Sequence, residues 1–210
     1  MADAQDLPVH RPPDPPISLT PGVTYRWTTG TGRWLRFDAP AGETLAFDNT
    51  APEGAYLTVF ASNGETVRVV PEGLLEWLPG ALEGPLQTIS SLDDLNEYLV
   101  SLERQEMPAD LIGALRDIPQ LVVGEPLVRR LGDVDATFVD VTVDDDFTGG
   151  ATCGAARCIY LFGFDDPVKV ESTMRIGVLP PSPDGDQWYV ILTDAETSGA
   201  FIDSFAIYDT

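Results

Sequence analysis

The chain has 210 residues, of which 34 are acidic and 12 are basic, and its formal net charge at neutral pH is −22. A surface with this much negative charge repels nucleic-acid phosphates and anionic lipid headgroups. Hydrophobic residues make up 43% of the sequence, as in ordinary globular proteins, and no apolar run is long enough to cross a bilayer. We therefore expect a globular chain with neither nucleic-acid binding nor membrane insertion.

The first 16 residues form a distinct segment that is rich in proline and aspartate. This composition predicts a flexible, partly polyproline-like leader over residues 1–16. The leader has neither the apolar stretch nor the cleavage pattern of a signal peptide. Either the protein is cytoplasmic, with Met1 as its native start, or it is exported and an export signal precedes Met1. Residues 17–210 are predicted to form a single domain.

Short runs of β-branched and aromatic residues, separated by proline and glycine, dominate the first part of this domain. Asn63-Gly64 suits a tight turn, so the runs on either side of it are expected to form a hairpin. An apolar but irregular stretch, residues 71–89, follows and is predicted to be a loop. The predicted strands cover residues 24–28, 34–38, 44–47, 55–61 and 66–70.

Two helices are predicted in the middle of the chain. Leucines recur at spacings of three and four over residues 92–104, which indicates an amphipathic helix. Ser91 is its expected N-cap, and Asp94 completes a short-chain form of the capping box. A second, shorter helix is predicted between Pro108 and Pro119, both of which suit helix boundaries.

Strand patterns return in the last part of the chain. The clearest covers residues 136–143, where Thr137, Val139, Val141 and Val143 are expected on one face. Residues 198–205 are predicted to form a closing helix. Strands, then helices, then strands predict an α+β fold, mainly antiparallel β-sheet with one or two helices packed on it. The other predicted strands cover residues 121–123, 127–131, 158–164, 173–179 and 187–193.

Several short motifs give the chain a family resemblance. The order of its motifs resembles that of uncharacterised exported proteins of high-GC bacteria, whose shape is similar to a PsbP-like α/β sandwich. The chain departs from their pattern at Gly42-Glu43, where Gly-Trp is expected, and at Leu131-Gly132-Asp133, where Gly-Gly is usual. The resemblance implies an exported, single-domain, non-enzymatic protein. The matching motifs are residues 19–25, 35–42, 92–102, 131–132, 136–143, 153–158 and 201–207.

Cys153 and Cys158 are the only cysteines. Gly154 allows the tight bend that a bridge over so short a loop needs, which favours a structural disulfide and an oxidising compartment. Two free thiols are the alternative. The spacing differs from the Cys-x-x-Cys redox motif, and a zinc site would need further ligands.

Groups that move protons near neutral pH are scarce in this sequence. His10 is the only histidine and lies in the leader, and no P-loop or dinucleotide-binding motif is present. We therefore expect no enzymatic activity and no cofactor.

Carboxylates remain as candidate site residues. Asp144, Asp145 and Asp146 follow the clearest predicted strand and supply the oxygen ligands that calcium prefers, although no EF-hand loop is present. They are either solvated turn residues or a weak calcium site. A pair of carboxylates is also the apparatus of a glycoside hydrolase. The four tryptophans could line a sugar-binding cleft but are more typical of a core.

The leading functional hypothesis is a non-catalytic, exported binding domain at the cell envelope, with a protein or a small apolar ligand as its partner. Leu74, Trp77 and Leu78 are the predicted interaction surface. A calcium-modulated module that uses the Asp-rich loops is one alternative. A hydrolase that acts through paired carboxylates is another.

Overall fold

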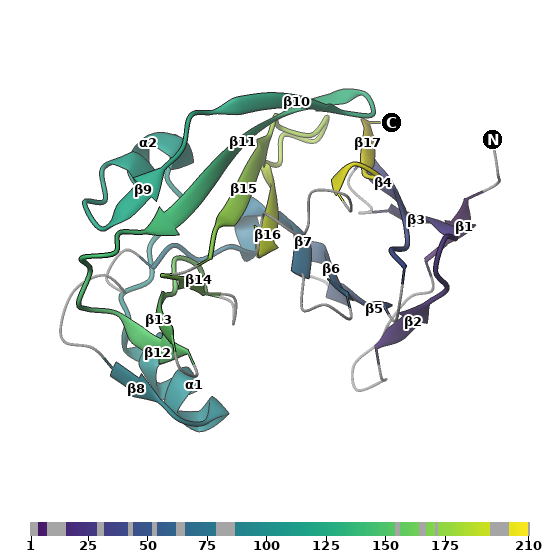
Figure 1. Cartoon of the computed structure of the whole chain (residues 1–210). Helices are drawn as coiled ribbons and strands as arrows, with labels where there is room; N and C mark the ends of the chain where they lie inside the picture. Colours follow the sequence, from purple (N-terminus) through teal and green to yellow (C-terminus); the bar gives the residue numbers. More distant parts are fainter. Residues whose placement is uncertain are drawn as a thin grey trace. The chain divides into compact units, whose positions relative to one another are not determined.

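The computed structural model describes residues 4–7, 16–28, 32–41, 44–51, 54–61, 66–78, 87–153, 156–163, 167–170, 172–193 and 202–209 (Figure 1). They belong to two compact units, which are described separately. Unit 1 comprises Met1–Leu74, Pro126–Phe138 and Arg175–Thr210, and unit 2 comprises Leu75–Glu125 and Val139–Met174. The expectation of a single domain over residues 17–210 stays a prediction.

Antiparallel pairing dominates unit 1. Its smaller sheet has the order β1-β3-β4-β17, and the larger sheet follows the path β10-β11-β15-β16-β7-β6-β5-β2, both counted over the described residues. The strands are β1 (Gln5–Asp6), β2 (Ile17–Leu19), β3 (Thr24–Thr28), β4 (Arg33–Asp38), β5 (Thr44–Ala51), β6 (Gly54–Ala61), β7 (Thr66–Pro71), β10 (Leu127–Leu131), β11 (Val134–Val143), β15 (Met174–Leu179), β16 (Trp188–Thr193) and β17 (Ala206–Asp209).

The hairpin expected around Asn63-Gly64 is confirmed. β6 pairs with β7 in the register Leu57↔Val69, although the Asn63-Gly64 turn itself lies outside the described residues. A second hairpin pairs β15 with β16 in the register Gly177↔Val190, and the proline-rich residues 180–183 lie in the loop that joins these strands. Most strand predictions are therefore correct to within a few residues.

The structure corrects the leader prediction at residues 4–7. β1 pairs in parallel with β3, in the register Gln5↔Tyr25, and Leu7 is buried in the core of unit 1. The N–H of Leu7 donates to the carbonyl of Arg26 over 2.7 Å. Regular structure therefore begins before Ile17, because burial of Leu7 and pairing with β3 stabilise a short strand in this proline-rich segment.

The structure also corrects the end of the chain. Among the described residues 202–209, Ile202 to Phe205 form only a turn, closed by the N–H of Phe205 donating to the carbonyl of Ile202 over 3.1 Å. β17 then pairs with β4, in the register Ile207↔Leu35. Residues 198–201 of the expected helix lie outside the described residues. The apolar residues whose spacing predicted a helix over residues 198–205 therefore end in a turn, and a strand follows that turn.

Aromatic side chains fill the core of unit 1. Trp27 and Trp188 meet edge to face at 6.2 Å between ring centroids, and Phe37 stacks on Phe205 at 5.4 Å. Trp27 and Trp188 are only 2% and 1% exposed, so they are core residues, as the sequence indicated.

One strand, β11, changes its buried face along its length. Val134, Ala136 and Phe138 are buried in unit 1, whereas Val139, Val141 and Val143 are buried in unit 2. Phe138 and Val139 are consecutive buried residues, so the alternation shifts by one position there. Thr137 and the three valines occupy alternate positions of β11, as expected for one face of a strand, but of these four residues only the valines are buried.

Unit 2 combines a small sheet with two helices. Its sheet has the order β14-β13-β12-β8, in which β8 pairs in parallel with β12, and β9 pairs with the end of β11. The elements are β8 (Gln87–Ile89), α1 (Leu92–Ser101), α2 (Leu111–Arg116), β9 (Leu121–Val123), β12 (Ala151–Cys153), β13 (Ala156–Ile159) and β14 (Val168–Lys169).

Both helices confirm the sequence analysis. Ser91 is the N-cap of α1, and its Oγ accepts from the N–H of Asp94 over 3.1 Å. The carboxylate of Asp94 accepts from the N–H of Ser90, one residue before the expected one, over 2.9 Å. Asp110 caps α2 by accepting from the N–H of Gly113. With two helices and mainly antiparallel strands, the α+β class is confirmed.

Candidate ligand-binding site

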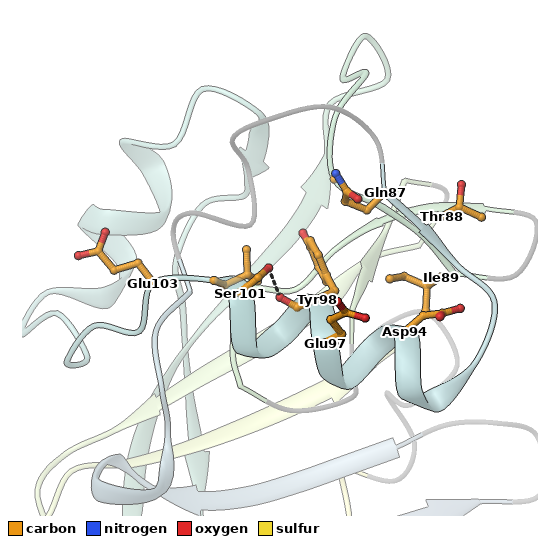
Figure 2. Close-up of a pocket in the computed structure, with 10 residues that line it drawn as sticks. Gln87, Thr88, Ile89, Asp94, Glu97, Tyr98, Ser101 and Glu103 are labelled. Carbon is orange, nitrogen blue, oxygen red and sulfur yellow. Dashed lines mark hydrogen bonds between the residues drawn. The ribbon is translucent and has the colours of Figure 1, made fainter.

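A polar cavity in unit 2 is the candidate site. It has a volume of about 670 Å³ and opens between β8 and α1 (Figure 2). Figure 2 shows Tyr98 and Glu97 projecting from α1, with Gln87, Thr88 and Ile89 supplied by β8. The described lining residues are Gln87, Thr88, Ile89, Asp94, Glu97, Tyr98, Ser101, Leu102, Glu103 and Gly150.

Gly150 places β8 in this site. The carbonyl of Gly150 accepts from the N–H of Gln87 over 2.8 Å, and β8 then continues along β12 in the register Thr152↔Thr88. Gly150 has a φ of 80°, and a Cβ there would lie 2.5 Å from the carbonyl oxygen of Cys158. Only glycine tolerates both the positive φ and the close approach of the Cys158 carbonyl, so this residue determines the position of β8, which forms one wall of the cavity.

The helix supplies the opposite wall. Leu95 and Leu99 are buried, so the residues between them in the helical turn lie toward the surface. Glu97 is exposed, and Asp94 and Tyr98 are partly buried. The apolar stripe that predicted α1 therefore also determines which of its polar residues can line the cavity.

The lining carries negative charge. Asp94, Glu97 and Glu103 contribute carboxylates, and no lysine, arginine or histidine occurs among the described lining residues. The nearby Arg104 is held by Glu76, with its Nη1 2.6 Å from Oε1. None of the three cavity carboxylates forms an ion pair within the described part of the chain. The cavity thus favours cations over anions.

Tyr98 gives the cavity an aromatic surface. Its ring meets that of Tyr160 edge to face, at 6.0 Å between centroids, which holds it in place. Burial raises the pKa of Tyr98 above its usual value of 10.0, so the phenol stays neutral at physiological pH. Figure 2 also marks the bond from the Ser101 hydroxyl to the carbonyl of Tyr98, 2.6 Å long. A neutral phenol beside carboxylates offers a ring face to a bound cation.

The Asp-rich turn forms a separate feature. The carboxylate of Asp144 accepts from the N–H of Asp146 over 2.8 Å, and the carbonyl of Asp145 accepts from Arg157. Asp144 and Asp146 line a second cavity of about 360 Å³ with Phe147. Within the described residues, no group of three His, Cys, Asp or Glu side chains is arranged to hold a metal ion. Calcium binding at this turn stays a prediction.

The two cysteines lie on adjacent strands of one hairpin. Cys153 pairs with Ala156, and Cys158 pairs with Ala151, so the cysteines are diagonal to each other in the β12–β13 ladder. Cys158 is fully buried, and its Sγ lies 3.4 Å from the carbonyl oxygen of Ala151. The disulfide between Cys153 and Cys158 stays a prediction.

The expected interaction surface needs a correction. Trp77 and Leu78 are only 5% and 1% exposed, and Leu74 is partly buried. The ring of Trp77 packs against Phe162 at 5.9 Å between centroids, and the N–H of Leu78 donates to the carbonyl of Leu161. Trp77 and Leu78 therefore belong to the core of unit 2, because backbone hydrogen bonds to Gln105 and Leu161 hold this stretch there.

Sequence reasoning missed the residues of the cavity. The sequence predicts α1 but not β8, which lies within a stretch predicted to be a loop, so Gln87, Thr88 and Ile89 are not among the predicted site residues. The available signal was the acidic polar face of α1, at Asp94 and Glu97. His10, the other candidate for chemistry, lies outside the described residues.

No helix in the described part of the chain combines the length and the apolar character that a membrane span requires. The chain matches no protein-family model and no curated protein. Among solved structures, it is similar to the solution structure of cyanobacterial PsbP (CyanoP) from Synechocystis sp. PCC 6803. The TM-score is 0.40 and the sequence identity 14%, and the match covers 94% of this chain and 100% of that chain. This is a weak likeness of fold, which says nothing of high-GC bacteria, export or function.

Proposed function

We propose that this chain is a non-catalytic binding domain that holds a positively charged ligand in the cavity between β8 and α1. The observation that supports this most is the lining, with three carboxylates, a neutral tyrosine ring and no cationic side chain among its described residues. A ligand ammonium or guanidinium group would pair with the carboxylates and lie against the ring. The polar lining favours such a ligand over the small apolar ligand that the sequence suggested.

Export to the cell envelope is part of the same proposal. A bridge between Cys153 and Cys158 would fit an oxidising compartment. Alkylation under denaturing conditions without reductant, followed by mass spectrometry, tests the bridge, since a bridged chain takes up no alkyl group. Uptake of two alkyl groups in this assay, by protein freshly isolated from its source cells, would contradict the disulfide. Fractionation of the source cells tests the compartment, and recovery in the cytosol would contradict export.

Binding of a small cation tests the ligand class. The probe is N-acetyl-argininamide, and its neutral isostere N-acetyl-citrullinamide is the matched control. We expect the amide resonances of Ile89 and Tyr98 to shift in NMR titrations with the cation at millimolar concentration. The isostere should leave these resonances unchanged, because it has the same shape without the charge.

Variants locate the charge that is responsible. Glu97→Gln should weaken binding of the cation about two- to fivefold, the effect of one exposed charge pair of about 0.5–1 kcal/mol. Glu106→Gln is the matched control, because Glu106 is exposed and lies outside the cavity lining. Equal binding of the two probes, or equal effects of the two variants, would contradict the proposal. Hydrolysis of a glycoside that is lost in Glu97→Gln would contradict its non-catalytic character.

A further inference from the structure

Among the residues that the structure describes, β8 is an edge strand. It lies at the end of the order β14-β13-β12-β8 and pairs there with β12 alone. The N–H groups of Gln87 and Ile89 point toward β12, where they donate to Gly150 and to the Thr152 hydroxyl over 2.8 and 3.0 Å. Because strand residues alternate in direction, the N–H and C=O of Thr88 point the other way.

Thr88 is exposed, and its backbone has no hydrogen-bond partner within the described ranges. β8 also has no lysine or proline, residues that commonly prevent an edge from pairing with another chain. An unpaired N–H and C=O on a strand edge form a template for one further strand. This template lies in the wall of the acidic cavity, since Thr88 is one of its lining residues.

Resting on the proposed function, we propose that the ligand is an extended basic peptide segment that adds to β8 as a further strand. Its backbone would pair with the N–H and C=O of Thr88. Its alternate side chains, arginine or lysine, would reach Glu97 and the ring of Tyr98, as residues at i and i+2 share one face of a strand. β8 has only three residues, so charge supplies the affinity that so short a ladder lacks.

Charge also distinguishes between occupants. A second copy of this chain carries a net charge of −22 and is repelled. Its basic pair, Arg129 and Arg130, is already bound to Asp203 and Asp135. A small amine satisfies the carboxylates but leaves the backbone of Thr88 unpaired. A basic peptide satisfies both features of the site.

Three probes test this proposal on the full chain: the peptide acetyl-Arg-Val-Arg-Val-Arg-amide, the same peptide N-methylated at its central arginine and both valines, and N-acetyl-argininamide. We expect the parent peptide to bind at least about tenfold more tightly than the methylated one, since methylation removes backbone donors but keeps the charge. The amide hydrogen of Thr88 should exchange more slowly when the parent peptide is bound. N-acetyl-argininamide should leave the exchange of this amide hydrogen unchanged.

Two variants locate the strand edge. Thr88→Pro removes the N–H and should abolish the preference for the parent peptide, whereas Thr88→Ala keeps the backbone and should bind the peptide within about twofold of wild type. Equal affinity of the parent and methylated peptides for the wild type would overturn strand addition, whether or not Thr88→Pro folds. If argininamide still binds in a Glu97-dependent way, the proposed function survives that result. If no cationic probe binds, both proposals fail.

Discussion

Replacement of Gly177 by alanine should destabilise unit 1 through a single contact. A Cβ at this position in β15 would lie 2.5 Å from Cε1 of Phe138 and 2.9 Å from its Cδ1 and Cζ. Phe138 is only 3% exposed and packs in the core, so its ring has little room to move. The φ of Gly177 is not positive, and alanine therefore meets no backbone strain there.

Two opposing effects decide the sign. Alanine restricts the unfolded chain and, by itself, stabilises the folded state by about 0.4–1 kcal/mol. Overpacking of a filled core costs about 1–3 kcal/mol. The contacts are well inside van der Waals distance, so we expect the steric cost to dominate. The free energy of unfolding should fall by about 1–2 kcal/mol.

Urea unfolding followed by tryptophan fluorescence measures this change. Phe138→Leu alone should also destabilise the protein, because it leaves a cavity. In the double variant, the smaller side chain accommodates the new methyl group, so the loss should be less than the sum of the two single losses by about 1 kcal/mol. Gly73→Ala is the matched control, because nothing lies within 4 Å of a Cβ there. Additive losses, or a Gly177→Ala protein as stable as Gly73→Ala, would refute the reasoning.

Three further predictions concern stability. Gly132→Ala should lower the urea midpoint strongly, because Gly132 has a φ of 63° and a Cβ there would lie 2.6 Å from the carbonyl oxygen of Ile207. Ser91→Ala should cost about 1 kcal/mol in the same assay through loss of the α1 cap, and Ser91→Asn should cost less. Burial, with the charge of Glu72, raises the pKa of Tyr189 from 10.0 to about 12. The folded state thus favours the neutral phenol, and this stability, present below pH 10, is lost as the pH rises toward 12. Tyr189→Phe should reduce that alkaline loss by about 2–3 kcal/mol in unfolding titrations at pH 9 and pH 12, and an unchanged loss would contradict the assignment.

The sequence predicted those elements whose signals are local. α1 has its leucine stripe and its cap at Ser91, and β6 and β7 flank an Asn-Gly turn, so neighbouring residues alone define them. β1 and β17 had no such signal. Each is stabilised by a distant partner, β3 and β4 respectively, and by burial of one or two side chains such as Leu7 and Ile207.

The candidate site could not be predicted for a similar reason. β8 becomes a strand only by pairing with β12, and the N–H of Ile89 finds its acceptor on Thr152, 63 residues away. A three-residue strand has too few positions to show an alternating pattern. The acids of α1 were visible in the sequence, but nothing in it placed them beside an open strand edge. Conversely, Trp77 was prominent in the sequence and proved to be core.

Net charge alone cannot make the cavity selective, because acidic residues occur along the whole chain. Attraction between exposed charges is screened beyond about 8 Å at physiological salt, so the general surface contributes mainly to the rate of encounter. A backbone bond to Thr88 and a contact with the ring of Tyr98 act over shorter distances and persist as the salt concentration rises. The preference for the parent peptide over its N-methylated form, which carries the same charge, should therefore persist from low to physiological salt. That persistence separates a site from a charged coat, since a coat would bind the two equally charged peptides with equal affinity at every salt concentration.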